Sequence, residues 1–265
     1  MKLAEVSVII PCYRCTRTIE RAVASVAAQS LKPAEVVLVD DCSGDETIDT
    51  LRSIQQTYGA DWVRVIELAE NAGAGSARNS GWEAASQPYI AFLDSDDAWA
   101  PEKIEFQLNW MRAHPDAVMT GHGSRLVTDG DVPEPAIGED SEFVLITPLQ
   151  LLIASRFPTR TIMMKRDIPY RFVSGKRHSE DYLLCCEICL DGNLCYRSPA
   201  EMAYMFKASF GESGLSSDLW LMEKGIQSGL VSLYQDGRIG FFSLLLCSAW
   251  SLLRHMRRIV ILRLR

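Results

Sequence analysis

The chain has no low-complexity tract, no repeat of fixed period and no excess of basic residues. The first two absences indicate an ordinary globular protein, and 265 residues, 48% of them hydrophobic, can bury a sizeable core. The formal net charge of −7 argues against nucleic acid as the main partner, because nucleic-acid binding requires a basic face. A substrate that carries phosphates would need local positive charge, from arginines or from a metal ion.

The two ends of the chain lack obvious targeting signals. The first ten residues hold one lysine and an alternating stretch too short for a signal peptide, so we expect a cytoplasmic protein. The uncharged run 239–253 is shorter than the roughly 18–20 residues that span a bilayer. Five arginines follow without any acid: Arg254, Arg257, Arg258, Arg263 and Arg265. An apolar helix with a basic end suits a membrane interface, which predicts a membrane-associating tail over 236–265. The alternatives are a final helix docked on the domain and a dimer contact.

The chain has eight cysteines, and two pairs of them have C-x-x-C spacing. Zinc would require both pairs, Cys12–Cys15 and Cys186–Cys189, to lie on tight turns. The second pair lies in an apolar run typical of a helix, so we interpret the cysteines as reduced thiols of a cytosolic protein.

The first half of the chain alternates apolar strands with amphipathic helices. We predict strands at 6–11, 35–40, 62–68 and 89–93, and helices at 16–30, from Asp45 and at 76–86. Such alternation indicates a parallel sheet with helices on both faces, in which ligands lie beyond the carboxyl ends of the strands. Polar residues follow four of these ends directly: Tyr13, Asp40, Asp41, Asn71 and the cluster Asp94–Asp97.

The second half is less regular, with helices predicted after Pro101, at 149–154 and at 180–190, a strand at 161–165, and a loop-rich middle at 118–138. No linker divides the chain. We therefore predict one α/β domain over 1–235, with a nucleotide-binding half (1–100) and an acceptor-binding half (101–235).

The acids at the end of the fourth strand predict a metal site. Asp94, Asp96 and Asp97 repel one another unless a cation lies among them. Carboxylates together with substrate phosphates are the usual ligands of Mg²⁺ and Mn²⁺, so we assign Asp94 and Asp96 to the metal and the donor. We interpret Asp97 as a solvated cap of the next helix.

Four motifs occur in order: Pro11-Cys12-Tyr13, Val39–Asp45, Asn71–Asn79 and Phe92–Asp97. Together they resemble the N-terminal half of the family 2 glycosyltransferases, which have the GT-A fold, a mixed and mainly parallel sheet. The resemblance covers residues 5–110 and extends more weakly to about 217.

The resemblance implies a role for each matching residue. Pro11 and Tyr13 would line the base pocket, with Tyr13 stacking on the base, unless it is an ordinary core aromatic. Asp41 would accept a hydrogen bond from the base, and Asp40 would shape the pocket. Family members often carry asparagine after the tyrosine, whereas this chain has Arg14, which we leave unassigned.

Further residues would contact the sugar and the phosphates. Arg78 would approach the base or diphosphate, or else bridge structurally to Asp40 or Asp94. Asp94 would lie on the ribose side and Asp96 would bind the metal, Mn²⁺ or Mg²⁺. Lys207 stands where an arginine is common and would meet the donor phosphates.

The catalytic base is expected in Glu180-Asp181, similar to the family's Glu-Asp motif at the start of a helix. Asp181 would take the proton of the acceptor hydroxyl, and Glu180 would orient either the acceptor or the base. The alternative is that both only cap the helix.

The resemblance thus implies an inverting glycosyltransferase that uses a nucleotide sugar, with uridine favoured and guanosine or thymidine as the alternatives. The apolar and basic tail favours a lipid-linked glycan acceptor at the cytosolic membrane face. A nucleotidyltransferase is disfavoured because the first turn lacks glycine, and an inactive binding protein is disfavoured because Asp96 and Asp181 are present. Nothing in the sequence specifies an oligomeric state.

Overall fold

A computed structural model describes residues 3–128, 141–207 and 218–263. Within them, nine strands form one mixed sheet in the order β3-β2-β1-β4-β8-β6-β9-β5, with β7 paired to β9. The strands are β1 (Ala4–Cys12), β2 (Pro33–Asp40), β3 (Val63–Glu67), β4 (Tyr89–Phe92), β5 (Ala98–Trp99), β6 (Ala117–Leu126), β7 (Val144–Leu145), β8 (Met163–Lys165) and β9 (Leu194–Met205).

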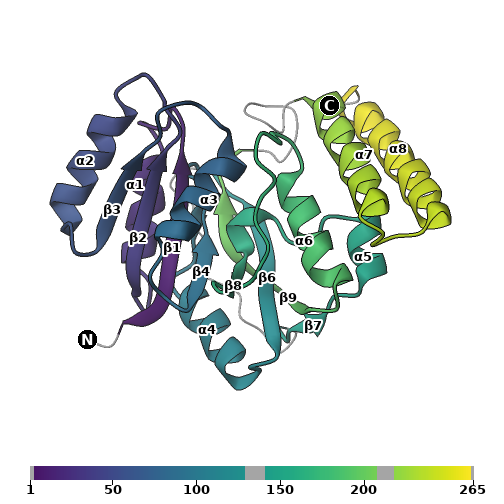
Figure 1. Cartoon of the computed structure of the whole chain (residues 1–265). Coiled ribbons are helices and arrows are strands. Elements are labelled where there is room, and N and C mark those ends of the chain that lie inside the picture. The colour runs from purple at the N-terminus through teal and green to yellow at the C-terminus, as the bar shows by residue number, and fades with distance from the viewer. Residues whose placement is uncertain (1–2, 129–140, 208–217, 264–265) are drawn as a thin grey trace.

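Helices cover both faces of this sheet (Figure 1). They are α1 (Ile19–Ala27), α2 (Thr47–Tyr58), α3 (Ala74–Ala84), α4 (Lys103–Ala113), α5 (Pro148–Ile153), α6 (Glu180–Leu190), α7 (Leu219–Gln235) and α8 (Phe241–Arg263), with a 3₁₀ turn, η1, at Thr159–Thr161.

Alternation along β1 divides the core into two layers. Val8 and Ile10 pack in one cluster with buried residues of α1, α2 and α4, whereas Ile9 packs in the other with residues of α3, α6 and α7. Gly81 allows α3 to approach closely, because a Cβ there would lie 2.5 Å from a methyl carbon of Ile9. The sheet therefore holds α3 and α6, which carry candidate site residues, on the same face.

The predicted first half is confirmed. Strands β3, β2, β1 and β4 are parallel, as the alternation of strands and helices requires. The predicted helices and strands are present with ends shifted by a few residues. The mixed, mainly parallel α/β class is correct, since antiparallel β8 joins β4 to the rest of the sheet.

The prediction for 118–138 is wrong over its first part. Residues 117–126 form β6, which pairs in parallel with β9, a long strand that the sequence interpretation also missed. Gly121 and Gly123 obscure the strand pattern, yet each is required by close packing. A Cβ would lie 2.5 Å from the Phe157 ring at Gly121 and 2.7 Å from the Pro199 carbonyl oxygen at Gly123. The rest of the loop prediction, residues 129–138, lies outside the described residues.

The C-terminal helix α8 is docked on the domain, which is one of the alternatives that the sequence left open for the tail. It packs beside α7 (Figure 1). Trp250 Nε1 donates to the carbonyl of Ile153 at 3.1 Å. In the described part of the chain, no helix combines the length and apolar character needed to cross a bilayer.

Candidate active site

The carboxyl ends of β1, β2 and β4 open into one cavity of about 1020 Å³. Nine of the predicted site residues line it: Pro11, Tyr13, Asp41, Arg78, Asp94, Asp96, Glu180, Asp181 and Lys207. Asp40 is buried behind the wall, with 3% of its surface exposed. Residues from both predicted halves of the chain therefore meet in a single cavity.

The turn after β1 forms one end of the cavity. Tyr13 is 47% exposed there, so the alternative of a core aromatic is wrong. Arg14 has φ of 48°, a left-handed conformation that asparagine tolerates better than most residues. Its backbone N–H donates to Ser43 Oγ at 3.0 Å and its Nε to the Ser43 carbonyl at 3.3 Å. Arg14 thus helps to fix this turn against the segment after β2.

The paired acids after β2 shape the neighbouring wall. Asp40 accepts hydrogen bonds from the hydroxyl and backbone N–H of Ser43. Asp41 accepts from the backbone N–H groups of Ala72 and Gly73 at 2.8 and 2.9 Å. Burial raises the pKa of Asp41, and these two hydrogen bonds oppose the rise. Asp41 therefore holds the loop before α3 in place while its carboxylate borders the cavity.

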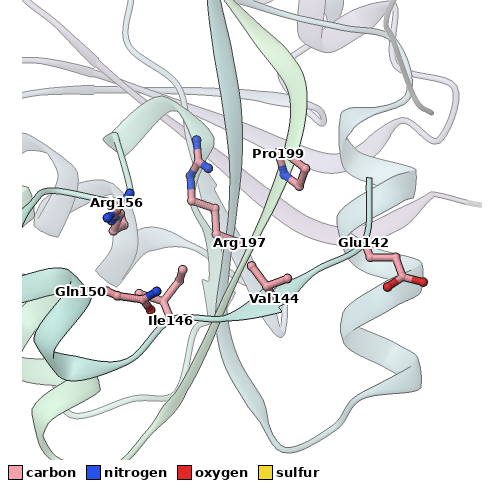
Figure 2. A pocket seen from close by; sticks show the side chains of 7 residues that line it. All are labelled: Glu142, Val144, Ile146, Gln150, Arg156, Arg197 and Pro199. Atoms are coloured by element: carbon pink, nitrogen blue, oxygen red, sulfur yellow. The ribbon is translucent and has the colours of Figure 1, made fainter. Parts of the chain in front are cut away.

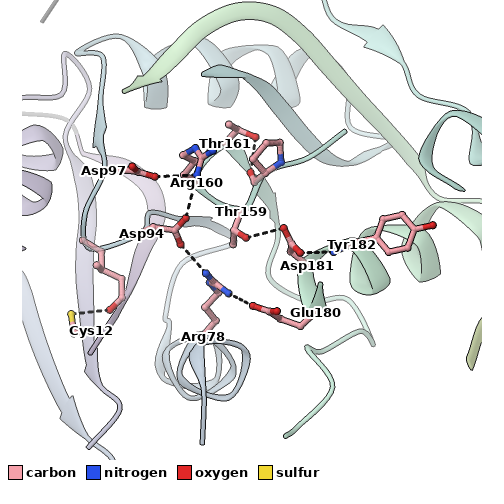
Figure 3. A network of polar contacts seen from close by, with 12 residues as sticks. Cys12, Arg78, Asp94, Asp97, Thr159, Arg160, Thr161, Glu180, Asp181 and Tyr182 are labelled. Carbon is pink, nitrogen blue, oxygen red and sulfur yellow. Dashed lines mark hydrogen bonds and ion pairs between the residues drawn. The ribbon is translucent and has the colours of Figure 1, made fainter. Parts of the chain in front are cut away.

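Arg78 joins the two halves of the site (Figure 3). Its Nη2 lies 2.7 Å from Asp94 Oδ1 and its Nη1 lies 2.9 Å from Glu180 Oε1. The side chain is only 6% exposed, so this is a buried ion-pair network between α3, the end of β4 and α6. The bridge to Asp94 is one of the two alternatives that the sequence left open, and the bridge to Glu180 was not predicted.

Asp181 has a different environment from Glu180. Its Oδ1 accepts the Tyr182 N–H at 2.8 Å and its Oδ2 lies 3.4 Å from Thr159 Oγ1 (Figure 3). Burial raises the pKa of both carboxyl groups, and the positive charge of Arg78 opposes the rise. Asp181 therefore carries no direct ion pair among the described residues, whereas Glu180 is held by Arg78.

Thr159 and Arg160 are site residues that the sequence interpretation missed. Arg160 Nη1 lies 3.2 Å from Asp97 Oδ2 and 3.8 Å from Asp94 Oδ2 (Figure 3). Burial raises the pKa of Asp97 to about 8 although Arg160 opposes this. Asp97 is thus a buried partner of Arg160, and its interpretation as a solvated helix cap is wrong. Only the antiparallel pairing of β8 with β4, which the sequence did not reveal, brings η1 to the cavity.

Asp96 and Lys207 form an ion pair at the mouth of the cavity. Lys207 Nζ lies 2.7 Å from Asp96 Oδ2, and the Asp96 side chain is 33% exposed. In the described residues no three His, Cys, Asp or Glu side chains form a metal-binding group. A cation at Asp96 would need oxygen ligands from a substrate, as Mg²⁺ commonly takes from phosphates.

A second hollow of about 440 Å³ lies beside β7 and β9 (Figure 2). Two of the side chains that line it, Arg156 and Arg197, are basic, and burial with the charge of Arg156 lowers the pKa of Arg197. None of the predicted site residues borders this hollow, so it is separate from the candidate active site.

The chain is similar in sequence to known glycosyltransferases. The putative teichuronic acid biosynthesis glycosyltransferase TuaG of Bacillus subtilis is 42% identical over 125 residues, 47% of this chain. The Escherichia coli enzyme WfaP, a UDP-Glc:alpha-D-GlcNAc-diphosphoundecaprenol beta-1,3-glucosyltransferase, is 40% identical over 108 residues, 40% of this chain. The matches span 49% and 41% of those two proteins.

The fold is also found in a solved structure. S. aureus TarS 1-349 in complex with UDP-GlcNAc has a TM-score of 0.68 and 23% identity, over 88% of this chain and 66% of that one. This likeness confirms the expected GT-A fold. The sequence model of the family described as "Glycosyl transferase family 2" matches residues 7–174, which is more than half of the sequence. The chain therefore belongs to that family.

Proposed function

We propose that this protein transfers a sugar from a nucleoside-diphosphate donor to an acceptor hydroxyl, with inversion at the anomeric carbon. The observation that carries the proposal is that the carboxylates of Asp96 and Asp181 line one cavity. The ion pairs of Arg78 connect the end of β4, which precedes Asp96, with the start of α6, which carries Asp181. TarS, whose fold this chain shares, was solved with UDP-GlcNAc. We favour a uridine donor on this ground.

Asp181 is the proposed general base. Its carboxylate takes the proton of the acceptor hydroxyl while that oxygen forms a bond to the anomeric carbon and the bond to the nucleoside diphosphate breaks. A base held near neutral pKa is efficient, and burial raises the pKa of Asp181 in that direction. Glu180 is already paired with Arg78, so we assign it the role of positioning the first turn of α6.

The donor would bind along the carboxyl ends of the parallel strands. Tyr13 offers an exposed ring for stacking on the base, Pro11 lines the same wall, and Asp41 retains lone pairs for a base N–H. Lys207 lies beside Asp96 and would meet the phosphates as a point charge.

The residues fit a divalent cation, Mn²⁺ or Mg²⁺. The partly exposed Asp96 carboxylate already contacts one cationic group, and Asp94 lies in the same cavity, although Arg78 and Arg160 both contact it. Asp96 is therefore the main proposed ligand and Asp94 the second. When bound, the ion would offset the charge that develops on the departing diphosphate.

Thermal-shift screening of nucleotide sugars, with Mn²⁺ and with EDTA, tests donor and metal together. We expect one donor to stabilise the protein only when metal is present. Asp181→Asn should retain that stabilisation and lose about 10²–10⁴ in turnover. The exposed Asp167→Asn is the matched control and should change neither property. Unchanged turnover in Asp181→Asn would remove this residue from the mechanism, and donor binding without turnover in the wild type would favour an inactive binding protein.

For the acceptor we propose a lipid-linked glycan at the cytosolic membrane face, as in surface polysaccharide synthesis. WfaP acts on a diphosphoundecaprenol-linked sugar. The outer face of α8 is apolar and exposed along five positions at helical spacing: Phe242, Leu246, Leu253, Met256 and Val260. Arg257 is exposed on the same helix, and no acid follows Ile239. An apolar face with basic residues suits an anionic membrane surface.

Co-sedimentation with phosphatidylglycerol vesicles tests the membrane proposal. We expect the wild type to pellet with them and to remain in solution with phosphatidylcholine alone. The double variant Leu246→Asp/Leu253→Asp should lose binding but keep donor-induced stabilisation, which shows that it still folds. Leu126→Asp, at an exposed leucine of β6, is the control and should bind as the wild type does. Full binding by the double variant would exclude the α8 face.

A further inference from the structure

The cavity extends beyond the donor residues to a wall formed by α7 and α8. Met222 and Ile226 of α7 line it together with Ser251, Arg254 and Arg258 of α8. In Figure 1, α6 stands between strands β1 and β4 on one side and the α7–α8 pair on the other. The family match ends at residue 174, so this wall belongs to the part of the chain that the match leaves unassigned.

Arg254 is linked through the end of α5 to the residue that follows the proposed base. It donates a hydrogen bond to the carbonyl of Ile153, and the Tyr182 hydroxyl donates to the preceding carbonyl, that of Leu152, at 3.0 Å. Tyr182 directly follows Asp181, whose carboxylate borders the same cavity. Only part of the Arg254 guanidinium is used by Ile153, since this group has several N–H donors arranged as a fork.

Arg258 adds a second positive charge one helical turn later. Burial and the charge of Arg254 lower the pKa of Arg258, and Glu223 opposes this. The Glu223 carboxylate also accepts hydrogen bonds from Gln227 at 2.6 Å and Ser251 at 2.9 Å. Like charges four residues apart on a helix repel each other. The wall therefore brings two guanidinium groups together with the apolar side chains of Met222 and Ile226.

We propose that Arg254 and Arg258 bind the phosphate groups of a lipid-diphosphate-linked acceptor, with Met222 and Ile226 contacting the start of its lipid. The inference rests on the proposed function and names the acceptor subsite of the same cavity. In such an acceptor, the hydroxyl that meets Asp181 and the phosphate on the anomeric carbon belong to one sugar, so both must fit in the same cavity. The phosphate therefore lies in the same cavity as Asp181, and Arg254 and Arg258 supply positive charge on its wall. Guanidinium groups bind phosphates through paired, charge-assisted hydrogen bonds.

Binding of farnesyl diphosphate, measured by calorimetry with the nucleotide of the stabilising donor in excess, tests the subsite. We expect the wild type to bind farnesyl diphosphate more tightly than inorganic pyrophosphate and to bind farnesol weakly, because charge and apolar contact act together. Arg254→Gln and Arg258→Gln should each weaken binding about 10-fold or more. Arg254→Lys should recover part of the loss. Lys224→Gln removes an exposed charge from α7 outside the cavity and should bind as the wild type does.

Folding of the variants is checked by donor-induced stabilisation, which the substitutions should leave unchanged. Trp250 still donates to the Ile153 carbonyl when Arg254 is replaced, so α8 keeps a contact with α5. Equal binding by wild type and both variants would overturn the subsite. Displacement of the probe by phosphatidylglycerol vesicles alone, without the arginine dependence, would assign the contact to membrane headgroups and also overturn it. Failure of every nucleotide sugar to bind or react would instead contradict the proposed function.

Discussion

The ammonium group of Lys207 lies 2.7 Å from Oδ2 of Asp96, so the carboxylate proposed to bind a metal already contacts a cation of the chain itself. Both side chains are partly exposed, at 43% and 33%, and an ion pair of this kind is weak. A divalent ion can therefore replace the lysine at the carboxylate. Lys207 would then be released toward the phosphates that arrive with the metal.

This pairing predicts opposite effects of Lys207→Gln on metal and donor. Without nucleotide, the variant should bind Mn²⁺ about 2–5-fold more tightly, because a competitor worth about 1 kcal/mol or less is removed. With metal present, it should bind the nucleotide sugar more weakly. Isothermal titration measures both constants, and Arg17→Gln, at another basic residue that lines the cavity, gives a comparison. Unchanged Mn²⁺ affinity would show that Lys207 does not compete for Asp96.

Replacement of Arg78 should be costly to stability. Arg78→Met leaves Asp94 and the buried Glu180 without their shared partner, and loss of one member of a buried network costs about 3–5 kcal/mol. Arg78→Lys should lose less, since it keeps the charge but cannot contact both acids through a planar fork. Urea denaturation measures the free energy of unfolding. Arg52→Met breaks the exposed pair with Glu67 and should cost at most about 1 kcal/mol.

The raised pKa of Asp181 predicts where activity is lost on the acid side of the pH profile, its acid limb. The base must be ionised, so kcat/KM should fall as pH drops through a pKa above the ordinary aspartate value of about 3.9. Burial is the main cause, and Arg78 moderates it. Initial rates across pH, with circular dichroism to confirm folding at each pH, measure the limb. A limb at or below the ordinary value would contradict Asp181 as the buried base.

Buried Lys103 should be replaceable with a gain in stability. Its side chain is 0% exposed, lies 3.7 Å from the centre of the Trp99 ring, and has no hydrogen-bond partner in the described part of the chain. Burial lowers its pKa, so the unfolded state binds more protons between the lowered value and the ordinary value of about 10.4. Wild-type stability should therefore rise with pH within that window.

Lys103→Met removes the buried amine and should lose that pH dependence. At neutral pH it should raise the free energy of unfolding by about 1–3 kcal/mol. Thermal denaturation should show an increase of about 2–4 °C for each kcal/mol gained. Lys224→Met, at an exposed position of α7, should leave the melting temperature nearly unchanged. A lower melting temperature in Lys103→Met would mean that the contact with Trp99 outweighs the cost of burial.

The first half of the fold was predictable because its strands are largely apolar and each of the first three is followed by a helix. The same regularity placed Tyr13, Asp41 and Asp94 at one edge of the sheet. The second half was harder because antiparallel and edge pairings depend on distant partners. Strand β6 contains Gly121 and Gly123, whose role is visible only against Phe157 and β9.

The candidate site shows the same division. Residues in motifs were found, whereas Thr159 and Arg160 reach the cavity only through the pairing of β8, which no local pattern encodes. Asp97 was misinterpreted because its neighbours suggested a helix cap, and its true partner lies 63 residues away in sequence. Local patterns predicted the elements of the first half, while the strands β6 and β9 and the long-range ion pairs became visible only in the folded chain.

The bridge from Arg78 to Glu180 has a consequence for domain exchange. A chimera that joins residues 1–100 of this protein to the later part of a relative would place Arg78 opposite a foreign α6. If that helix lacked an acid at its first position, Arg78 would keep its ion pair with Asp94 and lose the one that Glu180 provides. The first turn of α6 would then no longer be held by Arg78. Engineers who wish to swap donor specificity should therefore transplant the arginine and the glutamate together.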